Sequence, residues 1–276
     1  MNFPRKWTWT RPGFLIPVFF LSFYQGSGQT QWQESSVMAT GGCFVTRCGL
    51  TNGMFNQAGL GWIDGASLSI HHSRPFLIGE LGISGVSFQL PVHRGGFGTT
   101  ISTTGISGMR QFAAWTGFGL VLHPGITAGT GLYFQDYFTG DIGHHFGAGC
   151  ALGIQMKIRD DLILGAHISH PVSWVQEKST STLLPMIIST GLSYTFFKTA
   201  TYHTDLHFGM TGRIQWSHGL EVCFTKSIRL YLGICNAPTT LSGGVSMQYG
   251  CWEITMAAAC CFDTGTTPSC SLAYAW

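Results

Sequence analysis

Residues 145–159 alternate between two chemical classes, and this period of two constrains the fold more than any other feature of the chain. The even-numbered positions are all apolar: Phe146, Ala148, Cys150, Leu152, Ile154, Met156 and Ile158. The odd-numbered positions carry small, polar or basic residues, such as Gly147, Gln155 and Arg159. Because successive side chains of a strand point to opposite faces, one face of this strand is wholly apolar. Such a strand is typical of a membrane β-barrel, whose outer face meets lipid and whose inner face lines a lumen.

The same alternation recurs from about residue 66 to residue 276, divided by turn signals into about 14 segments of roughly 15 residues. The turn signals include Arg94-Gly95-Gly96, His123-Pro124-Gly125, Asp160-Asp161, Lys226-Ser227 and Asn236-Ala237-Pro238. One segment directs Leu184, Met186, Ile188, Leu192, Tyr194 and Phe196 outward. Before Gly85 the apolar residues Leu81 and Ile83 have odd numbers, whereas after it Val86, Phe88 and Leu90 have even numbers. This change predicts a β-bulge near Gly85.

Composition separates this fold from its competitors. Only 9% of the residues are charged, whereas a soluble domain has roughly a quarter. A soluble β-sandwich also alternates but rarely carries so few charges. No apolar run approaches the length of a spanning helix, and the 45% hydrophobic content excludes disorder. The sequence therefore predicts an all-β protein, a transmembrane antiparallel β-barrel of 14 strands over residues 65–276.

The N-terminus has the order of a secretory signal peptide over residues 1–28, with three basic residues before an apolar core from Phe14 to Tyr24. Removal of these three from the 14 basic residues leaves a net charge of −1 against 12 acidic residues, so no basic patch predicts nucleic acid as a partner. Residues 29–64 lack alternation. They are a periplasmic segment or a plug folded into the lumen, and the small inward side chains favour the plug.

The C-terminal segment alternates to the last residue, with Leu272, Tyr274 and Trp276 directed outward. A final strand that ends in an aromatic residue resembles the assembly signal of bacterial outer-membrane barrels. It implies the bacterial outer membrane as location, and its lipid and the barrel-assembly machinery as partners.

Cysteines and histidines are the candidate chemical groups. Nine cysteines are scattered, and only Cys43 and Cys48 lie close enough in the chain for a disulfide to be considered. His203, Asp205 and His207 share one inward face of a strand, as a polar cluster in the lumen. Alternate strand positions lie about 6.6 to 7 Å apart, so this pair of histidines cannot chelate a metal tightly alone. We expect no metal and no cofactor.

Three segments carry a resemblance to a known family. The segment from Gly53 to Gly61, GMFNQAGLG, is similar to the N-P-A-G-L motif that precedes the first strand of FadL-like barrels, so Asn56, Gln57, Ala58, Gly59 and Leu60 form its plug motif. The segments LILGAHISHP (162–171) and IRLYLGICNAP (228–238) look like the L-x-L-G-x-x-x-x-N-P repeat of the PorV/PorQ group of type IX secretion accessory proteins. Two positions depart from these motifs, Gln57 in place of Pro and His170 in place of Asn. The resemblance implies a 14-stranded outer-membrane barrel.

Three non-catalytic functions follow from this resemblance. The first is a PorV/PorQ-like barrel that docks or escorts secretion-system proteins, favoured because short connections leave few residues for a deep ligand cleft. The second is a FadL-like transporter of small hydrophobic compounds, with a hatch at residues 29–64 and a lateral exit near Gly85. The third is a barrel without a dedicated ligand. His167 and Ser169 share an inward face, but no G-x-S-x-G elbow occurs, so we expect no catalytic residues and no enzyme.

Overall fold

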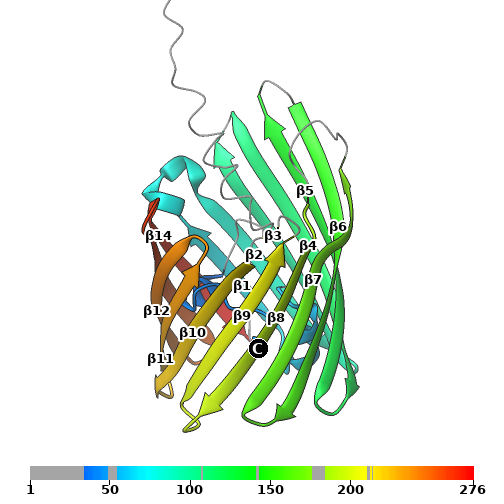
Figure 1. Cartoon of the computed structure of the whole chain (residues 1–276), viewed down its shortest axis with the longest axis vertical. Helices are drawn as coiled ribbons and strands as arrows, with labels where there is room; N and C mark the ends of the chain where they lie inside the picture. The colour runs from blue at the N-terminus through cyan, green and yellow to red at the C-terminus, as the bar shows by residue number, and fades with distance from the viewer. Residues whose placement is uncertain are drawn as a thin grey trace, which may run out of the picture.

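The described part of the chain forms one closed barrel of 14 antiparallel strands, in which each strand pairs with its neighbours in sequence and β14 pairs with β1 (Figure 1). The computed structural model describes residues 34–48, 55–106, 108–140, 143–175, 184–209, 212 and 214–276. The predicted fold class is confirmed. The proposed signal peptide lies outside the described residues, and the three domain boundaries stay predictions.

The strands differ in length. They are β1 (Ser67–Ser73), β2 (Ile83–Val92), β3 (Gly95–Ile106), β4 (Met109–His123), β5 (Ile126–Thr139), β6 (Gly143–Arg159), β7 (Leu162–Val175), β8 (Ile187–Phe196), β9 (Ala200–Gly209), β10 (Ile214–Thr225), β11 (Ile228–Asn236), β12 (Thr239–Tyr249), β13 (Trp252–Cys261) and β14 (Gly265–Ala275). Strands β4 to β7 have 14 to 17 residues and form the tall side of the barrel (Figure 1).

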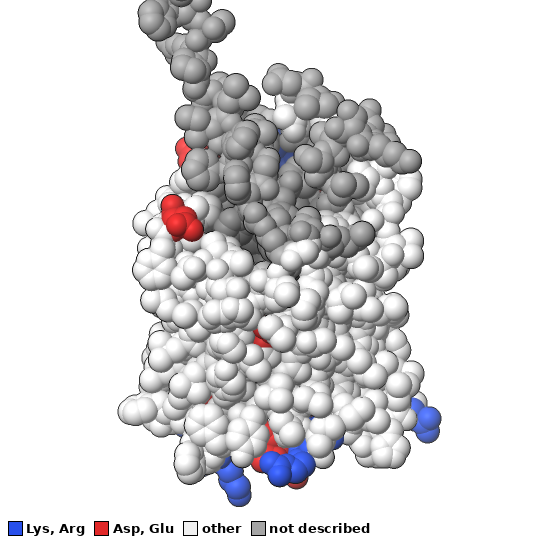
Figure 2. Space-filling view, viewed as in Figure 1, with Lys and Arg blue, Asp and Glu red and all other residues white. Residues whose placement is uncertain are grey.

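The two ends of the barrel differ in their connections. At one end, the turns after β2, β4, β6, β8, β10 and β12 have two or three residues each. Each of the five predicted turn signals overlaps a connection between two strands, which confirms the turns, although Gly95 and Gly96 belong to β3, His123 to β4 and Asn236 to β11. Two longer connections, β1–β2 and β7–β8, lie at the other end, and the first holds η4 (Pro75–Leu77) and η5 (Gly79–Leu81). Figure 2 shows Lys and Arg gathered at the short-turn end, where Lys198 and Lys226 lie in turns, below a wall almost free of charge.

The wall has an apolar outside and a small, polar inside. Leu132 and Leu232 expose 64% and 63% of their surface on the outer face, whereas inward-facing Gln155 and Ser189 are fully buried. In β6 the even positions face outward and the odd ones inward, as the alternation predicts. No helix among the described residues is long and apolar enough to cross a membrane.

The lumen is filled by the segment that precedes β1. Helix α2 (Ser35–Ala39) contacts β11 to β14, and the 3-10 helix η3 (Gln57–Trp62) contacts β2 to β6. We call residues 34–48 and 55–64 the plug. Its backbone lies directly on inward-facing glycines: a Cβ at Gly129 would overlap the backbone of Gln57, and one at Gly233 would overlap Thr40 and Gly41. The glycines of the inner face therefore provide the space that the plug occupies.

Two local predictions are wrong. Strand β2 pairs with β1 and β3 in unbroken register through Gly85, so there is no bulge. Of the two odd-numbered apolar residues that suggested it, Leu81 belongs to η5 and Ile83 is an apolar residue of β2 that faces inward. Leu184 does not face outward: it precedes β8 and packs inside the barrel against Ala113 and Tyr133. A side chain outside the strand is not bound to the alternation of the strand.

Candidate functional site

Strand β9 holds the plug through the polar face that the sequence places inside. Asp205 Oδ2 accepts hydrogen bonds from the backbone N–H groups of Phe44 (2.6 Å) and Val45 (2.9 Å). The ring of His207 stacks on Phe44, with centroids 5.3 Å apart and planes 16° apart. His203, two residues before Asp205 on the same face, is buried near Glu221 of β10. These three residues contact the plug or the cavity beside it; the sequence favoured a plug but did not show which wall residues it contacts.

Asn56 of the plug motif connects the two halves of the plug. Its Nδ2 donates to the carbonyl oxygens of Val45 (2.7 Å) and, in β7, Ala166 (3.3 Å). Its Oδ1 accepts from the N–H of Ala58 (3.2 Å), which caps the first turn of η3. Asn56 is fully buried, so each of these bonds replaces a bond to water that the side chain has lost.

Gln57 and Leu60 of the same motif fill the barrel on the side of β3 to β5. The Gln57 side chain lies on Gly117 and Gly131, and Leu60 lies on Gly98. Both residues are fully buried. The glutamine that replaces the motif's proline therefore packs between glycines of the wall.

Gln155 of β6 is a plug contact that sequence reasoning missed. Its Nε2 donates to the carbonyl oxygens of Val45 (2.9 Å) and Arg47 (3.2 Å). Its Oε1 accepts from Trp62 Nε1 (3.0 Å) and Cys48 Sγ (3.1 Å). The available signal was one long amide that follows four small residues on the inward face, Gly147, Gly149, Ala151 and Gly153.

A chain of charged groups joins the plug to the wall near the short-turn end. Arg47 of the plug pairs with Glu221 of β10 at 3.2 Å, and their side chains are 6% and 17% exposed. Arg229 of β11 lies 3.6 Å from Glu221 and pairs with Glu253 of β13 at 2.7 Å. Sequence reasoning missed this network too. The three wall residues sit at inward parity on nearby strands, and only the strand register brings them together.

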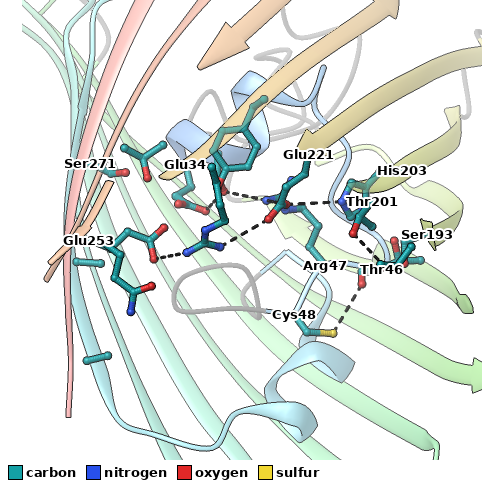
Figure 3. A pocket seen from close by; sticks show the side chains of 18 of the residues that line it. Glu34, Thr46, Arg47, Cys48, Ser193, Thr201, His203, Glu221, Glu253 and Ser271 are labelled. Atoms are coloured by element: carbon teal, nitrogen blue, oxygen red, sulfur yellow. Dashed lines mark hydrogen bonds and ion pairs between the residues drawn. The ribbon is translucent and has the colours of Figure 1, made fainter. Parts of the chain in front are cut away.

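A cavity of about 690 Å³ lies beside this network (Figure 3). Glu34, Ser36 and residues 46–48 of the plug line one side of it, and the inner faces of β7 to β14 line the other. Gly250 and Cys251 of the β12–β13 turn and Trp276 also line it, so the cavity reaches the short-turn end. Its other walls are mainly hydroxyl, carboxylate and guanidinium groups.

Apolar side chains gather inside the barrel near the opposite end. We call this group the upper apolar patch; it consists of Phe55, Ile83, Ala113, Trp115, Tyr133 and Leu184. Ile83 and Leu184 lie next to the two longer connections. Through Phe55 the patch continues into a cluster of Val37, Phe44 and Val45 on the plug. The plug thus has an apolar side toward the patch, while its residues 46–48 face the polar cavity.

Beside this patch, the β7–β8 pairing of the described residues ends before β7 does. Strand β7 pairs with β8 only as far as Ser169 opposite Ile187, although Ser173 to Val175 still pair with β6. Among the described residues, that edge of β7 has no strand partner beyond Ser169. His170 lies at this point with φ of 53°, and its ring is 5.2 Å from Tyr133 of the patch.

The two cysteines considered for a disulfide, Cys43 and Cys48, are free thiols in the structure. Burial raises the pKa of the Cys43 thiol well above its ordinary value, and the charge of Asp205 raises it further.

Ser169 Oγ lies 3.3 Å from His167 Nδ1 on the inner face of β7. The described residues hold no group of three or more His, Cys, Asp or Glu side chains placed to bind a metal ion.

The proposed C-terminal signal lies on the last strand and closes the barrel. Leu272 is opposite Ile70 of β1, the Tyr274 ring lies 5.7 Å from Trp276, and the Trp276 N–H donates to Ala66 (3.0 Å). Its role as an assembly signal stays a prediction.

We expect Trp276→Ala to lower the amount of folded barrel in cells several-fold while refolding of the purified chain in detergent is nearly unchanged, because the backbone bond to Ala66 does not need the indole. Quantification of folded protein in membranes and after refolding checks this. An equal loss in both would assign the indole to packing, not to recognition by the assembly machinery.

Comparisons with known proteins identify the fold and no more. No protein-family model matches the chain, and no curated protein is similar to it in sequence. Similar solved structures include the Pseudomonas putida toluene transporter TodX, with a TM-score of 0.67 and 11% identity over 90% of this chain and 98% of that one. The Ralstonia pickettii toluene transporter TbuX matches with a TM-score of 0.61 and 11% identity over 88% and 97%. A Pseudomonas aeruginosa FadL homologue matches with a TM-score of 0.60 and 10% identity over 88% and 97%.

These three structures share the barrel fold of this chain, and one of them is described as a FadL homologue. None of them is described as a type IX secretion component, so they lend the PorV/PorQ-like prediction no support.

Proposed function

We propose that this protein is an outer-membrane channel for small hydrophobic compounds, which is the transport alternative of the sequence analysis. The upper apolar patch carries the proposal. The inside of a membrane barrel is ordinarily polar because it faces water, whereas Ile83, Ala113, Tyr133 and Leu184 are at most 8% exposed and form a buried apolar cluster there. A ligand that displaces Leu184 would meet Trp115 and Tyr133 on the inner face, and this environment suits an apolar ligand.

The outer face supports the location in a membrane. Its leucines, isoleucines and phenylalanines form the exposed surface of the wall, and pairing of β14 with β1 closes the barrel. The short turns indicate the periplasmic end by the usual rule for bacterial barrels. The upper apolar patch then lies toward the outside of the cell.

The class of substrate is suggested by the fold neighbours and by the aromatic side chains of the patch. TodX and TbuX are toluene transporters, and the patch offers two aromatic side chains, whose rings pack favourably with other rings at offset or edge-on geometry. A monoaromatic hydrocarbon fits this chemistry.

The plug closes the direct route through the lumen, so the ligand needs another exit. The break in the β7–β8 ladder lies beside Tyr133 and Leu184, since His170 contacts the Tyr133 ring and Ser173 Oγ donates to the Leu184 carbonyl at 3.4 Å. We assign the lateral exit to this break. The unbroken ladder at Gly85 excludes the exit that parity suggested there.

Uptake of radiolabelled toluene by cells tests the proposal. Expression of the wild type should raise the uptake rate, and Leu184→Asn should weaken it about 5- to 50-fold, because an amide in the patch loses its water when the ligand binds. Leu184 lies outside the strands, so the barrel should still fold. Leu77→Asn is the matched control, since Leu77 lies in η4 at the same end and is 66% exposed.

Two results would count against the proposal. If wild-type protein does not raise uptake above that of cells without it, the channel function is wrong. If uptake rises but Leu184→Asn and Leu77→Asn behave alike, the ligand does not pass the upper apolar patch.

A further inference from the structure

The cavity at the short-turn end is chemically separate from the proposed hydrocarbon route. Phe44 and Val45 of the plug belong to an apolar cluster with Phe55, whereas the next residues, Thr46 and Arg47, line the cavity. Its volume of about 690 Å³ lies within the range of small-molecule sites, roughly 300 to 1,000 Å³. Unlike the upper apolar patch, its walls are rich in hydrogen-bonding groups.

Four of the five charged side chains that line the cavity compensate one another, and the fifth, Glu34, accepts a hydrogen bond from Ser36 Oγ at 3.0 Å. Arg47 pairs with Glu221, and Arg229 lies between Glu221 and Glu253, at the distances given above. A charged ligand would have to compete with these partly buried pairs, and separation of one buried pair leaves a charge that is costly to bury. The network therefore favours an uncharged ligand.

Two buried polar side chains of the cavity have no hydrogen-bond partner in the part of the chain that the structure describes. Neither ring nitrogen of His203 has a hydrogen bond; its Nε2 lies 3.8 Å from Glu221 Oε2, a contact that Figure 3 marks and that is an ion pair only when the ring is protonated. Thr46 Oγ1, on the plug, also has no hydrogen-bond partner. The two residues are 6% and 2% exposed, and both line the cavity, as Figure 3 shows from close by.

A hydroxyl group is the ligand function that matches these two side chains. A neutral imidazole has one donor and one acceptor, and a threonine hydroxyl can both donate and accept. A group that also does both can satisfy either side chain, and leaving a buried polar group unsatisfied is costly. Further hydroxyls of Ser193 and Thr201 line the same space.

We propose that this cavity binds a small, uncharged, hydroxyl-rich solute, such as a sugar or polyol, from the periplasmic side. The site is separate from the upper apolar patch and goes beyond the transport function proposed above. Sugar binding and hydrocarbon uptake are read out independently, so either proposal can fail without the other.

Saturation-transfer NMR on the mature barrel tests the site, in lauryldimethylamine oxide because detergents with sugar headgroups would compete. Glucose and sucrose are the uncharged probes, and gluconate and glucosamine are the charged ones. We expect transfer to the uncharged probes and little to the charged ones. This comparison needs no variant. Absence of transfer to glucose and sucrose, or equal transfer to all four probes, would overturn the proposal.

Variants locate the site. Thr46→Val and His203→Leu should each weaken binding about 3- to 10-fold, the effect of one hydrogen bond, and His203→Gln should retain more affinity because an amide also donates and accepts. Thr127→Val is the matched control: Thr127 Oγ1 is likewise buried without a hydrogen-bond partner among the described residues, but Thr127 faces η3 outside the cavity. If Thr127→Val weakens binding as much as Thr46→Val does, the cavity is not the site.

Discussion

The Asp205→Ala variant is expected to conduct ions far more than the wild type in planar lipid bilayers. Asp205 supplies the acceptor for two backbone N–H groups of the plug, at Phe44 and Val45. Hydrogen bonds to a charged acceptor contribute about 1.5 to 3 kcal/mol each, and the variant also leaves two buried N–H groups without a partner. The plug should therefore leave its closed position in a measurable fraction of molecules.

Asp136→Ala is the control for this measurement. Asp136 pairs with His144 at 2.9 Å, and that histidine is 55% exposed, so the pair is near the surface and away from the plug. An exposed pair of this kind contributes little to stability. Equal conductance of the wild type and both variants would show that Asp205 does not hold the plug closed.

Gly129→Ala is expected to cause the largest loss of folded protein. The added Cβ would overlap the backbone of Gln57 and Ala58, which lie directly on Gly129. Backbone atoms cannot rotate away as a side chain can, so either η3 leaves the wall or β5 is displaced from its neighbours. Overpacking of a well-packed interior costs about 1 to 3 kcal/mol and sometimes more. The folded fraction and the midpoint of thermal unfolding in detergent measure the effect.

Gly243→Ala adds the same methyl group where there is room, because its nearest neighbour would be the Tyr231 carbonyl oxygen at 3.4 Å. Alanine is also compatible with a strand at either site, since neither glycine has a positive φ. We expect Gly243→Ala to fold as the wild type does. Similar losses in the two variants would mean that strand propensity, not contact with the plug, explains the glycine of β5.

Alternation and turn residues predicted the strands of the wall well, because the direction of each side chain in a strand depends on the backbone of that strand alone. Alternation alone assigned the two faces of β6, and the turn signals marked the strand ends. The same reasoning failed where the chain leaves the strand: Leu81 lies in η5 and Leu184 precedes β8, so their parity carried no information about a face. The bulge assigned to Gly85 came from counting Leu81 together with Ile83, an apolar residue of β2 that faces inward.

The sequence by itself determined a 14-stranded barrel with an apolar outside, a small-lined inside and three polar residues, His203, Asp205 and His207, on one inward face. Only the tertiary structure decided what these inner faces meet. Contacts such as Asp205 with Phe44, Gln155 with Val45, and Arg47 with Glu221 join residues more than 100 positions apart. The path of the plug and the strand register decide such contacts, and a period of two reports only which way each side chain points.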